Sequence, residues 1–99
     1  MNSYLLTPAA EDDLFDIWSF VARDNPTAAD KLESDFFNTF QKLADKPDLG
    51  HHRKDLTDKL VRFFAVRGAY LVVYEALSPV RILRILHGAR DASSVLEDQ

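Results

Sequence analysis

The stretch VRFFAVRGAYLVVYEALSPVRILRILH, residues 61–87, decides how this chain folds. It contains three runs rich in Val, Ile, Leu, Phe and Tyr, a composition typical of β-strands. Gly68-Ala69 separates the first run from the second, and Ser78-Pro79 separates the second from the third. Because connections this short join antiparallel neighbours, the sequence predicts a three-strand meander over residues 61–87.

Side chains of a strand alternate between its two faces, so the runs also predict which residues lie together. Tyr70 and Tyr74, four residues apart, are expected on one face. In the last run one face would hold Val80, Ile82, Arg84 and Leu86, and the other Arg81, Leu83, Ile85 and His87. Both faces carry apolar residues, so we expect one to pack on helices and the other to be partly covered.

Upstream of the meander, apolar residues recur every three or four positions, as in amphipathic helices. Thr7-Pro8 favours a helix start, since a threonine caps free amides and proline fits the first turn. Asn25-Pro26 separates the two predicted helices, with Asn25 or Thr27 as the second cap, and Lys46-Pro47 ends the second helix. The stripe expected to be buried consists of Leu14, Ile17, Trp18, Val21, Leu32, Phe36, Phe40 and Leu43.

The remaining segments complete a single predicted domain, residues 1–99. Residues 3–7 (SYLLT) have the composition of a short strand, residues 47–60 that of a loop with little regular structure, and residues 90–99 the spacing of a short final helix. The fold class is therefore α+β. An N-terminal strand and a helical hairpin pack on one face of a small antiparallel sheet with a C-terminal three-strand meander.

Composition excludes several classes of protein. The absence of cysteine excludes a disulfide scaffold, a thiol nucleophile and a thiolate zinc site. No apolar run approaches the roughly 18–20 residues of a membrane span, and the start MNSYLLTPAAEDD turns acidic where a signal peptide is apolar. We therefore expect a cytoplasmic protein with no membrane contact.

Charge is unevenly distributed along the chain. Residues 1–50 carry 10 acids and 4 bases, whereas residues 51–90 carry 3 acids and 8 bases. The formal net charge of −4 does not favour a general nucleic-acid binder. The distribution fits either an uneven solvated surface or a basic face for an acidic partner.

Candidate functional residues are arginines and one histidine. The adjacent His51 and His52 point apart in an extended loop, so we expect no metal site there. His87 fits a structural histidine or a proton carrier. Arg84 has apolar strand neighbours and must extend to solvent or find a partner. Arg62, Arg81, Arg84 and Arg90 could form a guanidinium cluster for phosphate or carboxylate, or pair with the many acids of the chain.

In order and spacing, the chain resembles the ParE/RelE toxin family, ParE-like branch, from residue 4 to residue 96. The segments that carry the resemblance are Pro8-Ala9-Ala10, Asp12-Asp13-Leu14 with Ile17, Trp18 and Phe20, then Val61-Arg62-Phe63, Tyr70-Leu71-Val72-Val73-Tyr74, and Arg84-Ile85-Leu86-His87-Gly88-Ala89-Arg90-Asp91. The resemblance implies the toxin of a type II toxin–antitoxin system, with a cognate antitoxin as partner in a hetero-oligomer and no cofactor. It further implies that the basic segment 51–90 meets acidic residues of the antitoxin.

The family has two branches, which differ in mechanism. The ParE-like branch inhibits DNA gyrase by binding, whereas the RelE-like branch cleaves messenger RNA in the ribosome without a metal. Arg62 and Arg90 match basic positions of the nuclease branch, but Phe64, Leu71 and Leu96 stand where that branch has basic or acid–base residues. The resemblance therefore favours gyrase inhibition. In that case the residues that bind the target or the antitoxin would be Arg62, Arg81, Arg84 and Arg90. In the alternative, a ribosome-dependent ribonuclease, the catalytic residues would be Arg62, His87 and Arg90.

Overall fold

Both predicted helices begin at side-chain caps. The computed structural model describes residues 2–88, so the predicted tail helix and Arg90 lie outside the described residues. Helix α1 spans Pro8–Ala22, and the Thr7 hydroxyl accepts a hydrogen bond from the Ala10 amide at 3.1 Å. Helix α2 spans Pro26–Asp45, and the Asn25 side chain accepts from the Ala28 amide at 3.0 Å. These caps satisfy amides that have no partner within the helix, which confirms both predicted starts.

The four strands form one sheet with the order β1-β4-β3-β2. The strands are β1 (Tyr4–Leu6), β2 (Arg62–Val66), β3 (Tyr70–Glu75) and β4 (Val80–Leu86). The predicted antiparallel meander is confirmed, but β1 runs parallel to β4, so the sheet is mixed rather than wholly antiparallel. A neighbouring strand of either direction can form hydrogen bonds with the free backbone groups at the edge of β4. Its direction depends on the path of the chain through the helices, which local sequence does not encode.

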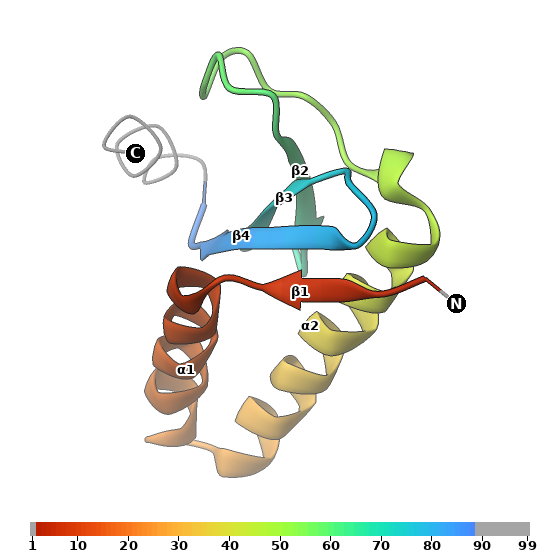
Figure 1. Cartoon of the computed structure of the whole chain (residues 1–99). Helices are drawn as coiled ribbons and strands as arrows, with labels where there is room; N and C mark the ends of the chain where they lie inside the picture. Colours follow the sequence, from red (N-terminus) through yellow and green to blue (C-terminus); the bar gives the residue numbers. More distant parts are fainter. Residues whose placement is uncertain (1, 89–99) are drawn as a thin grey trace.

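The helical hairpin covers one face of the sheet, which we call the helix-side face (Figure 1). Trp18 departs from the predicted buried stripe, since it is only partly buried and its indole N–H donates to Asp30 at 3.0 Å. An indole N–H needs a hydrogen-bond partner, and here the partner lies at the solvent-exposed side of the α1–α2 contact. Ile17 and Val21 are partly buried. The fully packed members of the stripe are Leu14, Leu32, Phe36, Phe40 and Leu43, which meet Val72, Tyr74, Val80, Ile82 and Ile85 of the sheet.

A β-bulge in β4 changes the predicted face assignment. Ile82 pairs with Tyr74 and Arg84 with Val73, so Leu83 is an extra residue in β4. Such an insertion shifts the alternation of every later side chain. Ile85 therefore joins Val80 and Ile82 at the helix-side face, and Leu86 turns to the other face, which reverses the prediction for both residues.

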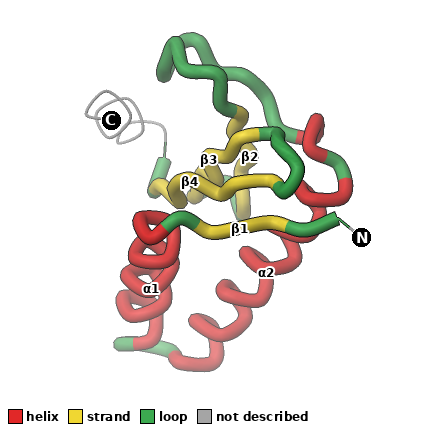
Figure 2. Tube along the Cα trace, viewed as in Figure 1, coloured by secondary structure: helices red, strands yellow, loops and turns green. Residues whose placement is uncertain are grey.

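The opposite face, which we call the outer face, is covered by the segment that precedes β2. A short 3₁₀ helix, η1 (Pro47–Leu49), leads into a loop that rises from the sheet on the side away from the helices (Figure 2). His51 pairs with Phe63 in an isolated antiparallel bridge. The outer cluster consists of Leu56, Val61, Phe63, Val73 and Leu86. Residues 47–60 therefore hold more structure than their polar composition predicts.

Candidate functional site

Two of the candidate arginines lie on opposite faces of the sheet. Arg62 pairs in register with Tyr74, whose ring belongs to the helix-side core. Arg81 pairs with Glu75, the next residue along β3, and successive strand residues point to opposite faces. Arg62 Nη1 donates to the Gly50 carbonyl at 2.8 Å and lies near Asp48, whereas Arg81 Nη1 contacts Glu75 Oε1 at 3.0 Å. The predicted guanidinium cluster therefore does not form between these two residues.

Arg84 has its partner in α1, as its apolar strand neighbours require. Its Nε and Nη2 donate to the two oxygens of Asp13 at 2.7 and 3.0 Å. These hydrogen bonds to Asp13 raise the pKa of the Arg84 guanidinium. The Ile85 amide also donates to Asp13 Oδ2 at 2.9 Å. One carboxylate therefore accepts hydrogen bonds from the Arg84 side chain and from a backbone amide of β4 that lies beyond the residues paired with β1. The sequence analysis did not single out Asp13, because an acid near the start of a helix indicates only a favourable interaction with the helix dipole.

His87 lies apart from Arg84. Its exposed ring stacks on Tyr70 with centroids 4.9 Å apart and planes at 26°, and Tyr70 meets Phe36 edge-on at 5.4 Å. Tyr70 and Tyr74 both pack on the helix-side core, as their spacing predicts. Arg84 and His87 thus contact different groups, the first a carboxylate of α1 and the second an aromatic ring of β3.

Tyr74 anchors the start of the loop, a role that sequence analysis did not reveal. The side chain is fully buried, and its hydroxyl donates to the Pro47 carbonyl at 2.6 Å and accepts from the Gly50 amide at 2.8 Å. Burial raises the pKa of this phenol. A Cβ at Gly50 would lie 2.5 Å from the Tyr74 oxygen, so only glycine fits here.

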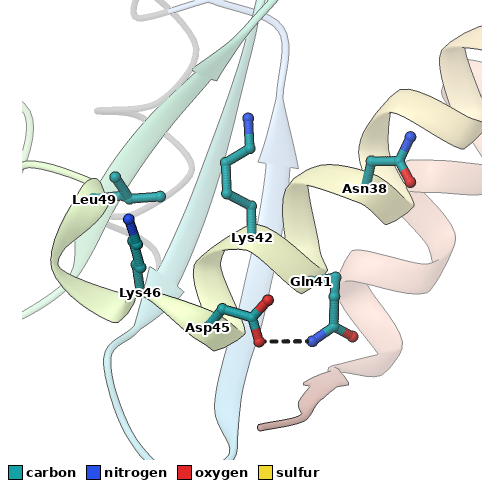
Figure 3. A pocket seen from close by; sticks show the side chains of 6 residues that line it. All are labelled: Asn38, Gln41, Lys42, Asp45, Lys46 and Leu49. Atoms are coloured by element: carbon teal, nitrogen blue, oxygen red, sulfur yellow. Dashed lines mark hydrogen bonds between the residues drawn. The ribbon is translucent and has the colours of Figure 1, made fainter.

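A groove of about 500 Å³ lies beside the C-terminal half of α2 (Figure 3). Gln41 donates to Asp45 at 3.1 Å at one side, and Lys42 and Lys46 supply positive charge. Among the described candidates, neither Arg62, Arg81 and Arg84 nor His87 lines this groove. Among residues 2–88, no three carboxylate or histidine side chains lie together as a metal site would need, and no helix has the length and apolar character to cross a membrane.

Comparisons with known proteins agree with this architecture. A family model described as the ParE toxin of the type II toxin–antitoxin system parDE matches residues 4–92. A solved structure from the chromosomal ParDE system of P. aeruginosa has a TM-score of 0.71 at 23% identity, covering 88% of this chain and 96% of that one. At this identity the likeness concerns the fold, and it confirms the predicted α+β class. No curated protein matches the chain.

Proposed function

Because the chain belongs to the ParE toxin family of type II toxin–antitoxin systems, we propose that it inhibits DNA gyrase by binding and that a cognate antitoxin neutralises it. The toxin carries out no covalent chemistry in this proposal. Its surface holds gyrase in an inactive complex, and the antitoxin prevents that contact in a hetero-oligomer.

The observation that supports binding rather than RNA cleavage is the internal pairing of the arginines. Between residues 51 and 88 each arginine has a carboxylate partner: Arg53 with Asp55, Arg62 with Asp48, Arg67 with Asp35, Arg81 with Glu75 and Arg84 with Asp13. Metal-independent cleavage needs cationic and acid–base groups that converge on one phosphate. In the described part of the chain these arginines are dispersed over both faces of the sheet and engaged by carboxylates.

The antitoxin is proposed on the same basis, since the solved relative comes from a ParDE toxin–antitoxin system. Its segment on this toxin would carry acids toward the basic residues 51–90. Ionic contacts of that kind weaken as salt is added, because exposed charges are screened.

The decisive experiment compares the two family mechanisms with the same purified chain. One arm measures supercoiling of relaxed plasmid by gyrase and ATP, and the other maps messenger RNA on translating ribosomes by toeprinting. We expect loss of supercoiling and no new cleavage sites. Cleavage of ribosome-bound message that disappears in His87→Ala would replace this proposal with the ribonuclease.

A further inference from the structure

We propose that the 51–60 loop is the segment that contacts the target, by placing Leu60 and its basic neighbours on an acidic surface of a folded protein. This inference rests on the proposed function, since it names the surface through which a binding toxin acts. The 51–60 loop lies outside the helices and the strands, and its exposed side chains have no role in the fold described above.

The loop is anchored at both ends by hydrogen bonds. On one side Gly50 is fixed by the Tyr74 hydroxyl and by Arg62, and His51 forms two backbone hydrogen bonds with Phe63 at 2.8 and 2.9 Å. On the other side His52 Nδ1 lies 3.1 Å from the Val61 carbonyl, across the base of the loop. The base of the loop is therefore fixed before binding, which lowers the conformational entropy that binding costs.

Leu60 points away from the apolar surface that the same loop covers. Leu56 and Val61 are buried in the outer cluster at 9% and 6% exposure, whereas the Leu60 side chain is 88% exposed. The loop thus has apolar surface within reach and leaves one large side chain outside it. Leu60 lines the same small cavity as the basic side chains of the loop, so exposed apolar and charged surface lie together there and can meet one partner.

The surroundings of Leu60 indicate the charge of the partner. A cavity of about 140 Å³ beside it is bordered by His52, Arg53, Lys54 and Lys59 as well as by Asp58. The Arg53 guanidinium holds Asp55 with hydrogen bonds of 2.8 and 2.9 Å, which lower the pKa of that carboxyl. Since Arg53 already holds Asp55, Lys54 is the basic side chain of this cavity that we expect to meet a carboxylate of the partner.

The same loop disfavours a nucleic acid. A phosphate backbone would meet Asp55 and Asp58 among the bases and would leave Leu60 in water. A protein surface supplies both an apolar pocket and isolated carboxylates. Because the loop is short and fixed at its base, it fits a folded target better than a flexible antitoxin segment, which gains affinity by wrapping large areas.

The test uses full-length purified chain and two matched variants. Leu60→Asp removes the anchor and adds a repelling charge, and Leu77→Asp makes the same change at another exposed leucine, outside the loop at 52% exposure. Inhibition of gyrase supercoiling, growth arrest in a bacterial host and the thermal midpoint are measured for each. We expect Leu60→Asp to weaken inhibition by about tenfold or more and to relieve growth arrest. Leu77→Asp should act as the wild type, and neither change should shift the midpoint.

A second variant tests the charge. Lys54→Glu should weaken inhibition by several-fold at low salt, with the difference shrinking as salt is added. The inference is overturned if the Leu60→Asp variant inhibits gyrase and arrests growth like the wild type. It is also overturned if the Leu77→Asp variant loses as much inhibition as the Leu60→Asp variant. Loss of antitoxin binding instead of inhibition in Leu60→Asp assigns the loop to the antitoxin and also overturns it.

The growth readout separates this inference from the proposed function. If the wild type arrests growth without inhibiting gyrase, gyrase is the wrong target, and the two leucine variants still decide whether the loop contacts the true one. A wild-type chain with neither effect overturns both proposals.

Discussion

The two faces of the sheet are covered in different ways. On the helix-side face, two regular helices bring Phe36, Phe40 and Leu43 against the strands, and these side chains are fully buried. On the outer face, an irregular loop contributes Leu56 and depends on polar anchors at Gly50 and His51 to stay in place. The first covering follows from a repeating apolar pattern, and the second from a few specific hydrogen bonds.

The difference assigns separate roles to the faces. Close packing of large side chains makes the helix-side face the main source of stability. A loop held by hydrogen bonds at its base can hold other side chains, such as Leu60, outside the core. Substitutions in the helix-side core should therefore destabilise the fold most, and those at the anchors should act mainly on the loop.

The largest effect is expected from Phe36→Ala. It removes a fully buried ring that contacts Phe40 and Tyr70, and the cavity should lower the free energy of unfolding by about 3–5 kcal/mol. Urea denaturation measures this loss, with Leu56→Ala in the outer cluster as the matched comparison at about 2 kcal/mol. A loss below about 1 kcal/mol for Phe36→Ala would show that the stripe is not the main core.

Asp13→Ala tests the contact between α1 and β4. It leaves both the Arg84 guanidinium and the Ile85 amide without their acceptor, so we expect a loss of about 2–3 kcal/mol. Arg84→Ala should cost less, since Asp13 keeps the Ile85 amide. Equal losses in denaturation experiments would mean that the backbone contact contributes nothing.

Gly50→Ala tests the anchor of the loop. Its Cβ would lie 2.5 Å from the Tyr74 oxygen and 2.9 Å from the Phe63 carbonyl, and this crowding should cost about 1–3 kcal/mol. Gly68→Ala is the control, because it meets no atom within 4 Å and suffers only from its φ of +68°, at about 1 kcal/mol. Equal decreases in the thermal midpoint for the two variants would contradict the close packing of Gly50 against Tyr74.

Tyr74→Phe should have the smallest effect at neutral pH. It leaves the Gly50 amide and the Pro47 carbonyl without the hydroxyl, at about 1–2 kcal/mol. Because burial raises the folded-state pKa of Tyr74 above its ordinary value of 10.0, the native protein binds this proton more tightly than the unfolded chain does. The stability that the protonated Tyr74 hydroxyl contributes is therefore fully present below pH 10.0 and is lost as pH rises through the folded-state pKa. Unfolding measured across this range should show a smaller alkaline decline in Tyr74→Phe, and an unchanged decline would contradict the assignment.

The local sequence pattern was sufficient to predict both helices and the strands of the meander. Thr7 and Asn25 cap the helices where polar residues precede prolines, and residues 61–87 form the predicted meander. Trp18, placed in the core by its spacing, needs a partner for its indole N–H and is only partly buried. Pattern also missed the bulge at Leu83, since nothing in an alternating run marks the residue that loses its partner.

The sequence predicted the contacts of the candidate site less well than it predicted the fold. The basic residues are evident from the sequence, but several partners that define the site lie far away along the chain. Arg84 meets Asp13, Arg62 meets Gly50, and the Tyr74 hydroxyl meets Pro47. Composition indicates that an arginine near apolar neighbours needs a partner. It does not indicate which of sixteen acids will be close.

The sequence by itself determined the helices, the strands of the meander and the family, because capping, periodicity and turn residues act over a few positions. Only the tertiary structure decided that β1 lies parallel to β4, that Asp13 binds Arg84 and that the 51–60 loop is fixed with Leu60 exposed. These features depend on contacts between segments that are distant in the chain. Their geometry exists only after the helices have packed on the sheet.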